Sequence, residues 1–208
     1  RRQRNATAGF VFHAINRAAG GWPLFATDDD YCAFLKVLEE GLAIAPIRIL
    51  AYTLMPNHWH LVLWPATDDQ LSEYLHWTTA THANRWHKAH GTQGRGALYQ
   101  GRFKSFPVQE DDHYYALTRY VERNALRANL VSRAESWRWC SLWQRQQDRA
   151  ALSLSAWPIP IPNNWLAWVN EPQTDTEMLR IRQCVQLSTP FGNFDWCGRT
   201  AKLLDLNP

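Results

Sequence analysis

The sequence is poor in cysteine and has no long apolar run, and both shortages narrow its class. Its 208 residues include four cysteines, none of them in a Cys-x-x-Cys pair. Such irregular spacing predicts neither a zinc site nor a disulfide framework, so a reducing cytosol fits. No stretch approaches about 18 uninterrupted apolar residues, so we expect no membrane span. No signal-peptide pattern and no internal repeat are evident.

Net charge is also small. Lys and Arg number 22 against 19 Asp and Glu, a formal net charge of +3 at pH 7. This balance permits a nucleic-acid partner without demanding one, so the local distribution of cations matters more. Hydrophobic residues make up 46% of the chain, which predicts a folded globular protein. The length allows one good core, or a core with an appendage.

Apolar periodicity and turn residues divide the chain into strands and helices. Strands are predicted over 10–16, 47–54 and 58–64, with a fourth ending at 108. Helices are predicted over 28–44, 68–89, 111–130, 174–186 and 193–206. The turn at Pro56-Asn57 joins the second and third strands closely enough for an antiparallel hairpin. A Pro-rich stretch over 155–162 predicts an extended linker.

The strand predicted over 58–64 carries two histidines on one face. The run Met55-Pro56-Asn57-His58-Trp59-His60-Leu61-Val62-Leu63-Trp64 is apolar, β-branched and aromatic. Because side chains alternate across a strand, His58 and His60 point to the same face. Two neighbouring imidazoles on a rigid sheet are half of a metal site. A bare His-x-His pattern is equally typical of one satisfied core histidine beside one rim histidine.

The helix predicted over 111–130 adds a candidate nucleophile. Tyr120 and Asn124 are four residues apart, so they share one helix face, one turn from each other. A phenol and a metal-competent amide on a helix, with two histidines on a strand, form a candidate nucleophile-and-cation site. Tyr114 and Tyr115 are rival nucleophiles, but neither has a metal-competent side chain four residues further on.

Cations and aromatic residues interleave before the fourth strand. This mixture suits a groove that binds phosphates and stacks bases, although a solvated basic face would have the same composition. The predicted DNA-contacting residues are five cations of this stretch and Arg127, which follows Tyr120 in the sequence. The five are Arg85, Lys88, Arg95, Arg102 and Lys104. His13 is expected to be a sheet residue rather than a ligand. The remaining histidines are expected at the surface or facing DNA: His76, His82, His87, His90 and His113.

These stretches resemble the HUH single-tyrosine transposases. The run Tyr52-Thr53-Leu54-Met55-Pro56-Asn57-His58-Trp59-His60-Leu61 is similar to their His-hydrophobic-His strand. The run Arg119-Tyr120-Val121-Glu122-Arg123-Asn124-Ala125-Leu126-Arg127-Ala128 is similar to their tyrosine helix. Within that class the resemblance is greatest to the REP-associated tyrosine transposases, bacterial proteins linked to repetitive extragenic palindromes. It extends over 84–105, and weakly over 137–141 and 189–192.

The resemblance implies an α+β fold, in which an antiparallel, ferredoxin-like sheet carries helices on its faces and the His strand is central. We expect residues 1–145 to form the HUH catalytic domain. Residues 146–208 are expected to form a Pro-containing linker and a C-terminal helical appendage. Its two amphipathic helices are a candidate DNA-reading module, although such helices also simply pack on a core.

The implied function is that of a metal-dependent endonuclease and strand-transferase for single-stranded DNA. It would cleave at or near hairpin-forming palindromic repeats through a 5′-phosphotyrosine intermediate. One alternative is a catalytically retired protein that only binds DNA hairpins. Another is a metal-dependent hydrolase in which the tyrosine is structural. The resemblance places the protein in the bacterial cytoplasm at the nucleoid, as a monomer or homodimer.

The resemblance also assigns roles to the site residues. Tyr120 would be the nucleophile, and His58, His60 and Asn124 would be ligands of a divalent cation. A mixed nitrogen and oxygen shell suits Mg²⁺ or Mn²⁺, with Mg²⁺ favoured by analogy to the family, while geometry alone does not exclude Zn²⁺. The implied partner is single-stranded DNA with a REP-like hairpin. The sequence names no general base.

Overall fold

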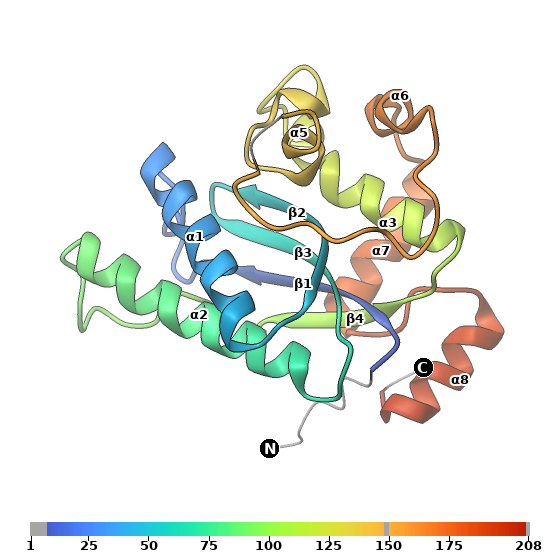
Figure 1. Ribbon diagram of the computed structural model, residues 1–208, viewed down its shortest axis with the longest axis horizontal. Helices are drawn as coiled ribbons and strands as arrows, with labels where there is room; N and C mark the ends of the chain where they lie inside the picture. The colour runs from blue at the N-terminus through green and yellow to red at the C-terminus, as the bar shows by residue number, and fades with distance from the viewer. Residues whose placement is uncertain (1–7, 148–149, 207–208) are drawn as a thin grey trace.

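The computed structural model describes residues 8–147 and 150–206, arranged around a four-stranded antiparallel sheet (Figure 1). The strands are β1 (Val11–Arg17), β2 (Arg48–Met55), β3 (His58–Trp64) and β4 (Lys104–Val108). Their order across the sheet is β2-β3-β1-β4. With α1 (Asp28–Ile44) after β1 and α2 (Gln70–Ala89) after β3, the chain forms a ferredoxin-like βαββαβ unit. The predicted α+β fold with a central His strand is confirmed.

Local sequence signals explain where α1 begins and why β2 and β3 pair. Thr27 caps α1, because its hydroxyl accepts from the Asp30 amide and its own amide donates to the Asp30 carboxylate at 2.9 Å. Three carboxylates in the first turn complement the positive end of the helix dipole. The short turn after Met55 returns the chain into β3, and the antiparallel register runs from Met55 opposite His58 to Arg48 opposite Trp64.

Helices cover both faces of the sheet, and alternation along β3 decides what each face receives. Trp59 and Leu61 face α1 and α2, which pack side by side over one core (Figure 1). Val62 faces the other way, into a core shared with Leu117 of α3 (Asp112–Glu122). His58 and His60 share the parity of Val62, so the strand directs both imidazoles towards the α3 face.

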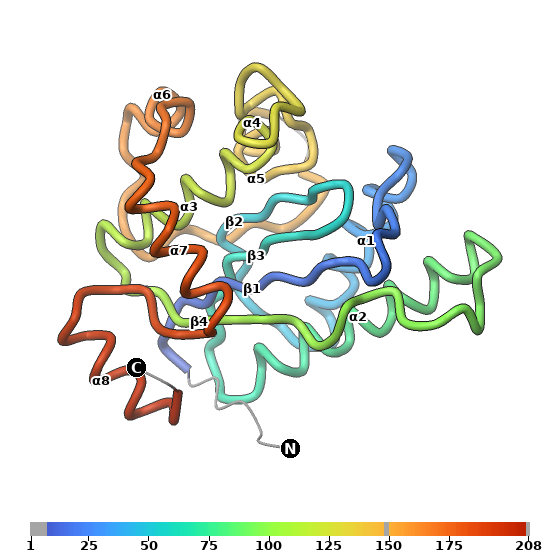
Figure 2. Tube along the Cα trace, turned by 180° about the vertical axis from the view of Figure 1, so that it is seen from behind, coloured from blue at the N-terminus to red at the C-terminus, as the bar shows by residue number. Residues whose placement is uncertain are grey.

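Much of the C-terminal part of the chain packs on the α3 face, while Leu152 and Leu204 join the core beneath α1 and α2. It contains α4 (Asn124–Arg127), the short 3-10 helix η1 (Ala134–Ser136), α5 (Ser141–Gln144), α6 (Trp165–Asn170), α7 (Asp175–Leu187) and α8 (Phe194–Leu204). α7 contacts β4 and α3 (Figure 2), and its Ile181 lies in the same core as Val62 and Leu117. α7 and α8 lie where the sequence predicts helices, whereas α6 was not predicted. The domain boundary at residue 145 stays a prediction.

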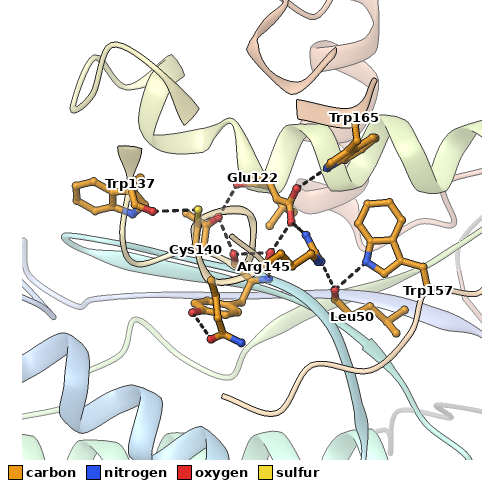
Figure 3. Close-up of polar contacts among 12 residues, drawn as sticks. Leu50, Glu122, Trp137, Cys140, Arg145, Trp157 and Trp165 are labelled. Atoms are coloured by element: carbon orange, nitrogen blue, oxygen red, sulfur yellow. Dashed lines mark hydrogen bonds and ion pairs between the residues drawn. The ribbon is translucent and has the colours of Figure 1, made fainter. Parts of the chain in front are cut away.

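A buried carboxylate joins the end of α3 to this C-terminal part (Figure 3). Glu122 is 0% exposed, and it accepts hydrogen bonds from the Arg145 guanidinium and, at 2.8 Å, from Trp165 Nε1. Arg145 also donates to the Leu50 carbonyl of β2 at 2.7 Å. Paired in this way, the buried charge does not stay uncompensated. The network fixes the end of the helix that carries the predicted nucleophile.

Within residues 8–147 and 150–206, none of the helices has the length and the apolar content needed to cross a bilayer.

Candidate active site

His58 and His60 lie next to each other on β3, with ring centroids 5.1 Å apart. His60 is 1% exposed, and His58, at the start of the strand, is partly exposed. The Nδ1 atom of each ring is already engaged. His58 Nδ1 lies 2.7 Å from Asn57 Oδ1, and His60 Nδ1 lies 2.8 Å from His13 Nε2. In both rings Nε2 is therefore the nitrogen left for a ligand.

Burial and nearby cations keep both imidazoles neutral. Loss of hydration lowers the pKa of His58 to about 4, and the charges of Arg17 and Arg127 add to the effect. The pKa of His60 is well below its ordinary value, first because of burial and then because of His13, His58 and the same two arginines. A neutral imidazole is the form that binds a metal ion, so the site holds both rings in that form at neutral pH.

Tyr120 and Asn124 lie on two consecutive helices. The single helix predicted over 111–130 is wrong, because α3 ends at Glu122 and α4 begins at Asn124. At the break the Thr53 hydroxyl of β2 donates to the Val121 carbonyl at 2.8 Å, and a side chain thereby takes over a helix acceptor. The Tyr120 ring nevertheless lies edge-on to His60, with centroids 5.9 Å apart. The break between α3 and α4 therefore does not separate the Tyr120 ring from His60.

Arg127 holds the tyrosine and the amide in one arrangement. Its Cζ atom lies 4.1 Å from the centroid of the Tyr120 ring. Its Nη2 donates to Asn124 Oδ1 at 2.9 Å, and its Nη1 donates to the Tyr120 carbonyl at 3.3 Å. Burial lowers the pKa of Arg127, but a guanidinium stays protonated in proteins. The sequence predicts a DNA contact for Arg127, and the structure places it against Tyr120 and Asn124, the predicted nucleophile and the predicted amide ligand.

The donor atoms at this site suit a divalent cation with open coordination positions. Both imidazoles keep Nε2 for a ligand, and Asn124 Oδ1 keeps one lone pair beyond its bond to Arg127. The Asn124 side-chain nitrogen is buried without a hydrogen-bond partner in the described chain, so the amide is not held by a complete internal network. The described ranges contain no group of three or more His, Cys, Asp or Glu that could hold a metal. Two imidazoles and one amide are one donor short of a closed four-ligand zinc site, and the identity of the cation as Mg²⁺ or Mn²⁺ stays a prediction.

Two of the predicted DNA-contacting cations line a pocket beside the histidines. Arg102 and Lys104 border a cavity of about 470 Å³ at the end of β1, together with Arg17. Arg17 lies directly opposite His58 in the β1–β3 register, so the cavity adjoins the His strand. Arg17 was not singled out in the sequence. Only the pairing register, which depends on two distant segments, brings it to the site.

The other three predicted cations are on or just after α2. Arg85, Lys88 and Arg95 are all exposed, and Arg85 forms an ion pair with Glu40 of α1 at 2.7 Å. No described contact joins them to the histidine site. Their contact with DNA stays a prediction.

One of the histidines expected at the surface or facing DNA is in the core. His82 is 3% exposed, and its Nδ1 lies 2.6 Å from the Tyr99 hydroxyl. The prediction for His82 was wrong because α2 packs against α1 more deeply than its polar sequence indicates, with the His82 ring 4.6 Å from the Phe34 ring. His82 is thus a structural residue of the α1–α2 face.

Comparisons with known proteins identify the family of the chain and a similar fold. The sequence profile of the family described as IS200-like transposases matches residues 9–124, more than half of the chain. A solved structure of the REP-associated tyrosine transposase bound to a REP hairpin is similar, with a TM-score of 0.55 and 18% identity over 78% of this chain and 98% of that chain. A crystal structure of a candidate transposase from Deinococcus radiodurans R1 is less similar, with a TM-score of 0.42 and 17% identity over 62% and 92%. No curated protein matches the chain.

Proposed function

The chain belongs to the family of IS200-like transposases, and we propose that it is a metal-dependent endonuclease and strand-transferase acting on single-stranded DNA. Its substrate in this proposal is a hairpin-forming palindromic repeat, the class of ligand bound in the structurally similar REP-associated transposase. The supporting observation is a series of contacts that runs from His58 to His60, from His60 to the Tyr120 ring, and from that ring through Arg127 to Asn124. The residues come from three separate elements of the fold.

Tyr120 carries the covalent step in this proposal. Its phenolic oxygen attacks the scissile phosphorus, a tyrosine–phosphorus ester forms, and the bond from phosphorus to the 3′ oxygen breaks. The phenol gives up its proton to solvent, and the departing 3′ oxygen takes one up. The products are a 5′-phosphotyrosine link and a free 3′-OH. A 3′-OH on another strand can reverse the step, so new DNA is joined without ATP.

His58, His60 and Asn124 would hold the cation, Mg²⁺ or Mn²⁺, which polarises a phosphoryl oxygen and offsets negative charge. Arg127 keeps the Asn124 oxygen and the Tyr120 ring in register with one another. Its guanidinium against the ring also favours the negative charge that develops on the phenol during attack. Both effects need no movement of the protein at the moment of reaction.

The cations around the pocket at the end of β1 give the strand a path to the site. Arg17, Arg102 and Lys104 would contact phosphates, which orients a strand without reading its bases. All four residues of the site come from one chain, so the proposal holds for a monomer and for a homodimer. Activity in the bacterial cytoplasm, at the nucleoid, is part of the same proposal.

The test is a covalent adduct. The purified protein, with Mg²⁺ or Mn²⁺ and a hairpin oligonucleotide labelled at its 3′ end, is expected to give a labelled species that survives SDS. Tyr120→Phe should abolish the adduct and keep DNA binding. Tyr115→Phe removes a neighbouring, partly buried phenol and is the matched control, which should keep the adduct.

Three other outcomes would reject the assignment. An undiminished adduct in Tyr120→Phe would exclude this nucleophile. Cleavage that survives Tyr120→Phe without a covalent species would favour a metal-dependent hydrolase. Hairpin binding without cleavage at any metal concentration would favour a retired hairpin-binding protein.

A further inference from the structure

A third histidine lies directly behind the two proposed ligands. His13 of β1 is 0% exposed, and its Nε2 is 2.8 Å from His60 Nδ1. On its other side the His13 ring packs against Phe106 of β4, with centroids 4.9 Å apart. In the β1–β3 register, His13 is opposite Val62 and Ile15 is opposite His60, so the two imidazoles are diagonal neighbours on one face. The backbone ladder therefore holds the contact in place.

Two ring nitrogens at this distance share a single hydrogen. If His60 Nδ1 carries it, His60 donates to His13, and His60 Nε2 is a bare lone pair that can bind a cation. If His13 Nε2 carries it, neutral His60 must be protonated at Nε2, and that nitrogen cannot bind a cation. Both rings are almost fully buried, and a buried ring without a partner of opposite charge is held in its neutral form. The direction of one hydrogen bond thus decides whether His60 can be a ligand.

The rest of the His13 environment gives no structural reason for an imidazole. Its Nδ1 is buried and has no hydrogen-bond partner in the described part of the chain. An unpaired buried polar atom destabilises the folded state, and an apolar ring would fill the same space against Phe106 without that loss. A buried polar atom left unpaired requires an explanation. The only bond that His13 side-chain atoms make among the described residues is the one to His60.

We propose that His13 is a positioning residue, which accepts the hydrogen of His60 Nδ1 and so presents the His60 Nε2 lone pair to the cation. The proposal rests on the proposed function for the identity of the cation site. In metal-binding histidines the N–H of the second ring nitrogen usually donates a hydrogen bond to a carboxylate or a carbonyl, and this bond contributes to metal affinity. Here a neutral imidazole does the same work, on a strand adjacent to the ligand strand.

The test compares two substitutions that differ in acceptor. His13→Phe keeps a ring of similar size and removes the acceptor. His13→Gln can place an amide oxygen near the position of Nε2 and keep it. His76→Gln changes an exposed histidine of α2 and serves as the control. In full-length protein without DNA, Mn²⁺ affinity measured by electron paramagnetic resonance should fall about 10–100-fold in His13→Phe. Affinity should stay near the unmodified value in His13→Gln and His76→Gln.

A second measurement uses the unmodified protein and needs no stable variant. Nitrogen-15 chemical shifts of the histidine rings, with His60 assigned by loss of its signals in His60→Leu, should show hydrogen on Nδ1 and none on Nε2. Hydrogen on Nε2 of His60 would overturn the proposal. So would unchanged Mn²⁺ affinity in His13→Phe, or equal losses in His13→Phe and His13→Gln. Failure of the DNA adduct with the expected tautomer and Mn²⁺ results would instead reject the proposed function alone.

Discussion

Two buried histidines on opposite faces of the sheet, His82 and His60, differ in what surrounds them. His82 lies between α1 and α2, where the Tyr99 hydroxyl is 2.6 Å from its Nδ1 and accepts from Trp59 Nε1 at 3.1 Å. His60 lies on the α3 face and contacts a second imidazole, a tyrosine ring and its neighbour His58. Burial lowers the pKa of His82 to about 3 and that of His60 well below its ordinary value.

The comparison shows that depth and a low pKa do not identify a site by themselves. Both histidines are almost fully buried. What separates them is the chemistry of their neighbours. His60 contacts two imidazoles and the Tyr120 ring, and two arginines contribute to its low pKa, whereas the rings around His82 are those of Phe25, Phe34 and Tyr99. Titratable side chains gathered next to charge are typical of functional sites.

The largest effect is expected on cleavage when His60 is replaced by leucine. His60→Leu removes a proposed ligand, so adduct formation should fall more than about 100-fold, beyond the range seen for residues that only support a ligand. It also leaves His13 Nε2 unpaired, so the free energy of unfolding should fall by about 1–3 kcal/mol. Gel assays of the adduct and urea unfolding measure the two effects. Retained cleavage in folded His60→Leu protein would remove the distinction between the two faces.

The matched substitution on the other face should cost stability alone. His82→Leu deprives the buried Tyr99 hydroxyl of its acceptor, so the free energy of unfolding should again fall by about 1–3 kcal/mol. The rate of adduct formation per folded molecule should stay the same, because no residue of the site contacts His82. Urea unfolding and the adduct assay check both expectations. A loss of cleavage comparable with that of His60→Leu would mean that the α1–α2 face also takes part in the chemistry.

The sequence predicted those elements and contacts whose signals lie in neighbouring residues. The bounds of α1 and β3 were predicted closely, because an acidic first turn, helical apolar periodicity and strand alternation all lie in neighbouring positions of the sequence. The convergence of Tyr120 with the two histidines was also predicted, from one helix spacing, one strand period and a family resemblance. The break in that helix was not, because it depends on the Thr53 hydroxyl from a different element.

The roles of the remaining histidines needed contacts between distant segments. His13 was predicted as a sheet residue, and it is one, but its link to His60 follows from a register between strands 47 residues apart. His82 looked polar and exposed in sequence, since the residues that bury it come from α1 and from the loop before β4. Residue type alone does not show whether a histidine lies in a core, at a rim or in a site. The residues that it contacts distinguish these roles.

A pH titration should sharpen the comparison from the His82 side. The folded-state pKa of about 3 lies below the unfolded value of about 6.5, so the unfolded chain takes up the proton first as pH falls. Stability is lost from about pH 6.5 down to about pH 3, at up to about 1.4 kcal/mol per pH unit from this group. Asp30 opposes the low pKa and His90 reinforces it. In His82→Leu the free energy of unfolding, measured with urea, should depend less on pH between pH 6 and 4. An unchanged dependence on pH would mean that His82 does not have the lowered pKa.

The smallest effect concerns Arg182, a cation that α7 adds near Arg127 on the α3 face. Arg182 of α7 is exposed, and its charge contributes to the lowered pKa of Arg127, so it lies beside the site. Arg199 of α8 is equally exposed, but α8 packs near the other end of β1, where Trp196 contacts Phe10. Arg182→Ala should weaken hairpin binding about 3–10-fold and lower the salt slope of log K by about 1, as expected for one lost phosphate contact. Fluorescence anisotropy between 50 and 200 mM salt, roughly the range over which such contacts respond, measures both. Arg199→Ala should change neither the hairpin affinity nor the salt slope. Equal effects of the two substitutions would mean that DNA binds basic residues over the whole surface, without preference for the α3 face.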